Sequence, residues 1–146
     1  MFRFAFVSTA LVLSALTLPT HAQAPLAMTV YKSPTCGCCA KWVEHIKKAG
    51  FAVTVKDMPN VGEVKYARGV PADLASCHTA VVGNYVIEGH VPADVVQKLL
   101  KEKPAVAGIA VGGMPMGSPG MEGSYTDRYD VVAFDKNGNK RVFASR

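Results

Sequence analysis

The chain has 146 residues, of which 49% are hydrophobic and 18% are charged, and its formal net charge is +5 at pH 7. This composition excludes a disordered polyelectrolyte and is typical of a globular protein. The basic residues are scattered, with no long run and few aromatic residues among them. The sequence therefore gives no support for nucleic-acid binding.

The longest apolar stretch stands at the start of the chain. Arg3 precedes it and small residues follow it. This order predicts a secretory signal peptide over 1–22, with cleavage at 22 or 24, and one mature domain over 23–146. The apolar run is shorter than the roughly 20 residues that span a bilayer. We therefore expect no stable membrane span in the mature form.

The first predicted elements are a strand, a helix and a second strand. The segment 28–34 is rich in β-forming residues, and 51–57 has the same character. Between them, apolar residues recur at helical spacing and predict one buried helix face made of Cys39, Trp42, Val43, Ile46 and Ala49. Gly50 is the expected end of this helix. The short gap before the second strand predicts a parallel β-α-β unit.

The next predicted elements are a short helix around 61–68, a hairpin and another helix. The runs HTAVVG and YVIEG are separated by little more than Gly83 and Asn84, which predicts a β-hairpin. The segment VPADVVQKLLKEKP predicts a helix ended by Pro104, with one apolar face made of Val95, Val96, Leu99 and Leu100.

The last part of the chain predicts a strand of small residues, a Gly/Pro/Met-rich loop and a second hairpin around Asn137 and Gly138. The complete order of elements predicts an α/β protein. It resembles the thioredoxin fold with an added C-terminal β-hairpin and a Met/Gly/Pro-rich loop. A resemblance in fold does not by itself assign a function.

Four cysteines carry the main chemical signal. Cys36, Cys38 and Cys39 form CGCC where the first strand leads into the first helix. At least one sulfur should lie at the helix N-terminus, which stabilises a thiolate. Cys36 and Cys39 alone have the spacing of a redox dithiol, but three sulfurs in one turn favour a soft metal such as copper(I). Cys77, just before the third strand, is the expected fourth ligand.

Two alternatives use the same cysteines. They can form two disulfides, for which three connectivities exist, although the adjacent Cys38 and Cys39 can hardly pair with each other. They can also form a closed tetrahedral zinc site. The crowding of the sulfurs and the nearby methionines favour copper over both.

Histidines and one glutamate extend the candidate site. His78 adjoins Cys77 and His90 lies in EGHVP, so both are candidate metal ligands. His45 lies about 10 Å along the helix from the cysteines and is expected to be solvated or hydrogen-bonded. Glu88 can orient His78 or His90, as carboxylates do for metal-bound imidazoles. A solvated carboxylate at a strand end is the simpler expectation for it.

Three methionines, Met114, Met116 and Met121, lie in the loop GGMPMGSPGMEG. Helical core periodicity does not explain methionines in a loop. Thioether sulfur is a soft, uncharged ligand that suits copper, so these residues are added to the candidate metal ligands. The alternative is that they fill irregular space in the core.

Three stretches, SPTCGCCAKWVEHIKKAGF, GVPADLASCHTAVVGNYVIEGHVP and GGMPMGSPGME, together resemble the CopG-like family of periplasmic copper-resistance proteins. That family was long described as a domain of unknown function. The resemblance implies a thioredoxin-like fold, a periplasmic location and a multinuclear copper cluster, with a role in interconverting copper(I) and copper(II). The implied ligands are Cys36, Cys38, Cys39 and Cys77, with His78 and His90 in the matching later motifs.

The leading hypothesis is a periplasmic copper-binding protein that sequesters or redox-cycles copper, with more than one ion per chain; whether it is a copper oxidoreductase stays open. The rival is a thiol-disulfide oxidoreductase in which Cys36 attacks and Cys39 resolves. Such enzymes carry a proline before the third strand, where this chain has Cys77 and His78. A third hypothesis is a carrier that delivers copper to an efflux pump or redox partner.

Overall fold

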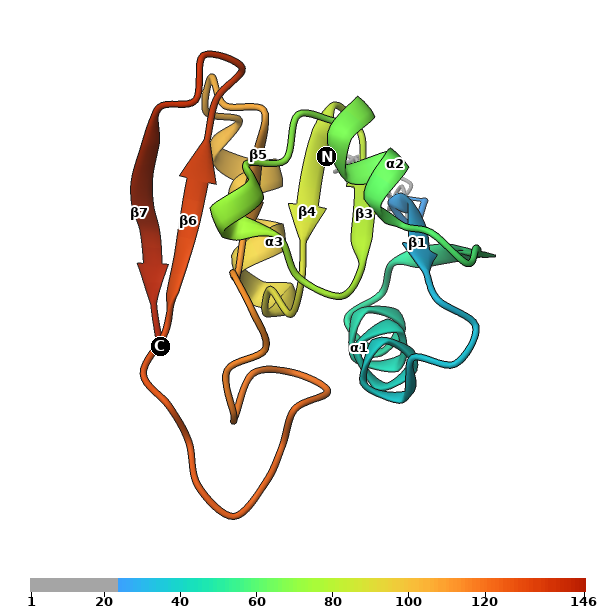
Figure 1. The fold of residues 1–146 in the computed structure, drawn as a ribbon. Coiled ribbons are helices and arrows are strands. Elements are labelled where there is room, and N and C mark those ends of the chain that lie inside the picture. Colours follow the sequence, from blue (N-terminus) through green and yellow to red (C-terminus); the bar gives the residue numbers. More distant parts are fainter. Residues whose placement is uncertain (1–23) are drawn as a thin grey trace, which may run out of the picture.

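The computed structural model describes residues 24–146, so the signal peptide predicted over 1–22 lies outside the described residues. The described chain is a mixed α/β structure with one seven-stranded sheet in the order β2-β1-β3-β4-β5-β6-β7 (Figure 1). The strands are β1 (Ala27–Lys32), β2 (Ala52–Asp57), β3 (Thr79–Val82), β4 (Tyr85–Glu88), β5 (Gly108–Ala110), β6 (Asp130–Phe134) and β7 (Lys140–Ser145). The helices are α1 (Gly37–Lys48), α2 (Gly62–Ala67), α3 (Ala93–Glu102) and a short 3-10 helix, η1 (Ala72–Leu74). In this part of the chain no helix is long and apolar enough to cross a membrane.

The strand pairing confirms the predicted β-α-β unit and both predicted hairpins. β1 pairs in parallel with β2 and antiparallel with β3. β3 and β4 form the first hairpin, and β6 and β7 form the second. Gly83, between β3 and β4, has a φ of +56°, a left-handed backbone that glycine adopts without steric cost. β5 joins the two parts of the sheet, parallel to β4 and antiparallel to β6.

Helix α1 begins and ends where the sequence predicts. Cys36 is its N-cap, and the Cys36 sulfur accepts the backbone N–H of Cys39 at 3.4 Å. The helix ends before Gly50, whose φ of +93° is a left-handed conformation. Its buried residues are Cys39, Trp42, Val43 and Ile46, as predicted, with Ala49 partly buried against the core. The predicted helix at α3 is also confirmed, with its N-cap at Pro92.

The main core lies between one face of the sheet and the helices α1 and α3. It includes Met28 and Val30 of β1, Ile87 of β4 and Ile109 of β5, packed against buried residues of both helices. A smaller cluster, made of Leu74, Val86, Ala110 and Phe134, covers the opposite face. This alternation along β4 and β5 follows from the two-residue period of a strand. Because α1 packs on the sheet through four buried residues, its N-terminus has a fixed position relative to β3.

Candidate metal centre

The four cysteines meet at the N-terminus of α1. The Cys38 sulfur lies 3.5 Å from that of Cys36 and 4.0 Å from that of Cys77. The sulfurs of Cys36, Cys38, Cys39 and Cys77 all lie within 4.8 Å of one another. The structure thus brings Cys77, from the segment before β3, to the first turn of α1.

Two of the sulfurs are covalently joined. Cys36 and Cys39 form a disulfide, whereas Cys38 and Cys77 are free and partly buried. The four cysteines therefore form one disulfide, and the alternative of two disulfides is wrong. Since a metal binds the thiolate form, Cys36 and Cys39 become available as metal ligands only after reduction.

Cys77 also belongs to a second group of ligand atoms, with His78 and His90. The Nε2 atom of His90 lies 3.0 Å from the Cys77 sulfur. The Nδ1 atom of His90 lies 2.8 Å from the carbonyl oxygen of Pro119, and because a carbonyl only accepts, Nδ1 carries the proton. The lone pair on Nε2 therefore faces the sulfur. A backbone carbonyl that fixes the tautomer in this way is typical of metal-binding histidines.

His78 is fully buried beside the same sulfur. Its Nδ1 atom lies 3.4 Å from the Cys77 sulfur, and its ring lies 4.3 Å from the Trp42 ring and 5.0 Å from the His90 ring, between centroids. Burial, with smaller electrostatic contributions from His90 and Lys65, holds the pKa of His78 well below its ordinary value. The ring is neutral at pH 7, and its Nε2 atom has no hydrogen-bond partner among the described residues. A neutral imidazole is the form that binds a metal.

The Cys77 thiol is held in its protonated form. Burial first, and then the neighbouring Cys38, raise the pKa of Cys77 to about 11. In the absence of a cation this group therefore stays a thiol at neutral pH. A bound metal ion displaces such a proton, because the ligand is the thiolate.

The loop between β5 and β6 closes one side of the site with backbone atoms. Figure 1 shows it in orange, extending beyond the strands toward α1. A Cβ atom on Gly120, whose φ is +88°, would lie 2.6 Å from the carbonyl oxygen of Cys38. Only glycine permits this close approach. Of the three methionines, Met114 is half-exposed, and Met116 and Met121 are partly buried. The structure thus brings their loop to the site and leaves the thioether ligands a prediction.

Glu88 is not the solvated carboxylate that the strand end predicts, and its hydrogen bonds go to neither His78 nor His90. Its side chain is fully buried and forms an ion pair with Lys65 of α2. It also accepts the Thr79 hydroxyl at 2.7 Å. The hairpin register places Glu88 opposite Thr79, but nothing in the sequence indicates that Lys65 of α2 contacts Glu88.

His45 is hydrogen-bonded, which is one of the two predicted alternatives. Its Nε2 atom accepts the backbone N–H of Ala93 at 3.0 Å, in the first turn of α3. Burial lowers the pKa of His45, in keeping with a neutral acceptor. Trp42 fills the core as predicted, and its indole N–H donates to the carbonyl of Val91 at 2.9 Å. Both contacts tie α1 to the segment that follows His90.

Sequence reasoning missed the residues that position Cys77, His78 and His90. Gly89 has a φ of +71°, and a Cβ atom there would lie 2.6 Å from the Ser76 side chain and 2.5 Å from the Val111 carbonyl oxygen. The Gly89 N–H donates to the carbonyl of His78 at 3.0 Å. A glycine inside EGHVP is a visible signal for a close backbone approach. Nothing in the sequence indicates that Pro119 orients His90.

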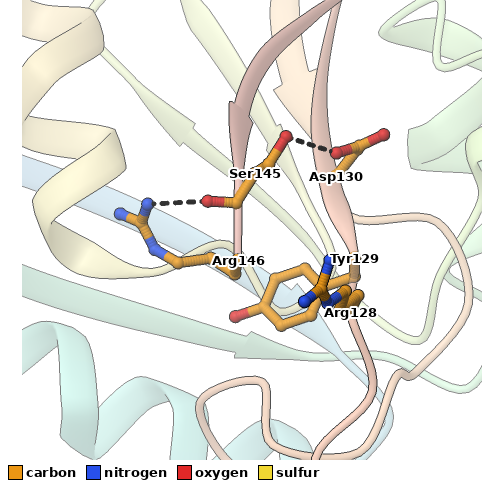
Figure 2. Close-up of a pocket in the computed structure, with 5 residues that line it drawn as sticks. All are labelled: Arg128, Tyr129, Asp130, Ser145 and Arg146. Atoms are coloured by element: carbon orange, nitrogen blue, oxygen red, sulfur yellow. Dashed lines mark hydrogen bonds between the residues drawn. The ribbon is translucent and has the colours of Figure 1, made fainter.

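A hollow of about 590 Å³ lies elsewhere, where β6 begins and β7 ends. Figure 2 shows Arg128, Tyr129, Asp130, Ser145 and Arg146 around it. The Ser145 hydroxyl donates to Asp130 at 2.6 Å, and Arg146 donates to the Ser145 carbonyl at 3.1 Å. These two hydrogen bonds join lining residues to one another at an exposed edge. The sulfur and imidazole cluster is the stronger candidate for function.

Four sulfurs and two neutral imidazoles on an α/β scaffold define a candidate centre for a soft metal ion. Two solved structures are similar to the chain. The structure titled "Copper resistance protein copG- Form 2" matches with a TM-score of 0.80 and 43% identity, over 84% of this chain and 98% of the other. The structure titled "Copper resistance protein copG- Form 1" matches with a TM-score of 0.79, the same identity and the same coverage.

The chain belongs to the family of the copper resistance protein CopG. A family model described as "Protein of unknown function, DUF411" matches residues 74–121, which contain Cys77, His78, His90 and the methionine loop. No curated protein matches the chain. The resemblance noted in the sequence is confirmed by these matches.

Proposed function

We propose that this protein binds copper ions at the cysteine cluster and protects against copper stress in the periplasm. The observation that carries the proposal is the convergence of four sulfurs within 4.8 Å of one another, one of which, Cys77, also faces two imidazoles. Soft thiolates select copper(I), zinc and iron-sulfur clusters among the metals of proteins. The names of the two similar structures support copper as the metal.

The two ligand groups share Cys77, which supports more than one copper ion per chain. In the reduced protein, Cys36, Cys38 and Cys39 offer three thiolates from one helical turn. Cys77 then bridges this group to His78 and His90. We include the thioethers of Met114, Met116 and Met121 as softer, outer ligands, because Pro119 and Gly120 of their loop contact the site.

The redox part of the proposal rests on the mixture of ligands. Thiolates favour copper(I), whereas imidazole also suits copper(II), so a site with both can hold each oxidation state. We propose that the centre interconverts the two with a redox or efflux partner, after export directed by residues 1–22. We also assign a thioredoxin-like fold, supported by the order β2-β1-β3-β4 and by α1 and α3 on one face.

The variant Cys38→Ser tests the proposal most directly. It removes the middle sulfur and leaves an ordinary C-x-x-C pair. Reduced protein is titrated with copper(I) without oxygen, and bound metal per chain and protected thiols are measured. We expect several ions in the parent and fewer, weaker ones in the variant. Thr35→Ala, a change at an exposed neighbour without sulfur, is the matched control. Parental binding by Cys38→Ser would refute the cluster, and preferential retention of zinc would favour a zinc site.

One observation favours a second candidate function, thiol-disulfide exchange. The Cys36–Cys39 disulfide caps α1, the location of a reactive dithiol in thioredoxin-like oxidoreductases. The segment before β3 argues against it, because Cys77 and His78 occupy the place of the expected proline. Insulin reduction by the metal-free dithiol form separates the two functions. Turnover at thioredoxin-like rates, unaffected by Cys38→Ser, would favour the oxidoreductase.

A further inference from the structure

A buried ion pair lies directly beside the segment that carries Cys77 and His78. The Glu88 carboxylate is fully buried, and the Lys65 ammonium that contacts it is largely buried. Neither residue belongs to the proposed metal ligands. An ion pair withdrawn from water in this way costs desolvation, so it is weak evidence for stability and calls for another explanation.

The two oxygens of Glu88 hold both ends of the segment 76–79. Oε1 accepts the backbone N–H of Ser76 at 2.7 Å, and Oε2 accepts the hydroxyl of Thr79 at 2.7 Å. Lys65 reinforces the second end, because its ammonium also donates to the Thr79 hydroxyl at 3.1 Å. Cys77 and His78 are the two residues between these anchors. Their backbone is therefore held from both sides by one carboxylate.

We propose that Glu88 is a positioning residue that fixes Cys77 and His78 in the geometry of metal ligands. The clamp explains why a charge is buried here, since one carboxylate accepts from a backbone N–H and a hydroxyl at the two ends of 76–79 and from an ammonium on α2. Hydrogen bonds to a charged group are stronger than neutral ones. The role as a metal-site clamp rests on the proposed function, whereas the ordering of 76–79 does not.

The distances at Cys77 show why such a clamp matters. Its sulfur lies 3.0 Å from Nε2 of His90 and 4.0 Å from the Cys38 sulfur. A metal site displaced by about 1 Å loses much of its function, because the ligands no longer match the geometry of the ion. Cys77 sits in a connecting segment outside any helix or strand, so its position has to be fixed by contacts of this kind.

The test compares Thr79→Val, Thr79→Ser and Glu88→Gln in the full reduced chain. Thr79→Val removes the hydroxyl at nearly constant volume, whereas Thr79→Ser keeps the hydroxyl and removes only the methyl group. Two readouts are used: the affinity for copper(I), by competition with a chromogenic chelator, and hydrogen exchange of the Ser76 amide without metal. Val131→Ala, a core change on β6, controls for loss of global stability.

We expect Thr79→Val and Glu88→Gln to weaken copper(I) binding roughly 10- to 100-fold, the range typical of residues that support metal ligands. The Ser76 amide should exchange faster in both, while Thr79→Ser and Val131→Ala keep the parental affinity. A folded Thr79→Val protein with parental affinity and parental Ser76 exchange would overturn the proposal. If the parent binds no copper(I), the proposed function fails, and Ser76 exchange alone decides whether Glu88 orders the segment.

Discussion

The two halves of the candidate metal centre are built in different ways. Cys36, Cys38 and Cys39 take their positions from one element, the first turn of α1 and its N-cap. Cys77 and His90 lie on connecting segments, held by contacts with Glu88, Gly89 and Pro119. The first half is local structure and the second is tertiary structure. Substitutions at residues that are not ligands should therefore displace the ligands of the second half more readily than those of the first half.

The largest effect is expected from removing the sulfur that joins the two halves. Cys77→Ser keeps the three sulfurs of α1 but separates them from His78 and His90. We expect a lower number of copper ions per chain and an affinity reduced by more than the roughly 100-fold upper range of supporting residues, since a ligand itself is lost. Anaerobic copper(I) titration measures both. Parental stoichiometry in this variant would show that the α1 sulfurs suffice alone.

The next effect is expected at Gly89, which lies in the second half of the centre and has no space for a side chain. Gly89→Ala would place a Cβ atom 2.5 Å from the Val111 carbonyl oxygen at a φ of +71°. The strain should lower the free energy of unfolding by about 3 kcal/mol. Urea denaturation of the reduced, metal-free protein measures this. Gly37→Ala, with no atom within 4 Å of the added Cβ and no positive φ, is the matched control in the local half.

The same division decides how much could be predicted from the sequence. The spacing of Cys39, Trp42, Val43 and Ile46 predicts α1 and its buried face, because a helix obeys a local period. The two hairpins follow from turn residues between β-forming runs. The four cysteines and the two histidines could be chosen by residue type, and the fold then brings their ligand atoms together.

The supporting residues could not be predicted in this way. The contacts of Lys65 with Glu88 and of Pro119 with His90 join segments far apart in the chain. Such pairs depend on tertiary packing, which no local period records. The Cys36–Cys39 disulfide is one of several pairings that the sequence allows, because sequence alone does not fix connectivity.

The next effect is expected from pH, and it concerns the histidines of the site. Burial lowers the pKa of both His78 and His90 in the folded chain. Below the unfolded value near 6.5, the unfolded state therefore binds protons that the folded state does not, and stability falls with falling pH. The slope is at most about 1.4 kcal/mol per pH unit for each histidine.

Urea denaturation of the metal-free, reduced protein between about pH 7.5 and about pH 5 measures this slope, above the range in which carboxylates titrate. His90→Gln should reduce the slope, because one titrating group is gone. A free energy of unfolding that stays constant over this range would contradict the expected burial of the two imidazoles.

The smallest effect is expected from the methionine loop between β5 and β6. Met114 is the most exposed of its three methionines, with 51% of the residue's full accessible surface exposed, so Met114→Leu should leave the fold unchanged. A thioether carries no charge and binds copper(I) less strongly than a thiolate. We therefore expect a decrease in copper(I) affinity smaller than that of Thr79→Val, measured by the same chelator competition. An equal decrease for Met114→Leu and Cys77→Ser would mean that the loop is as much a part of the centre as the cysteines.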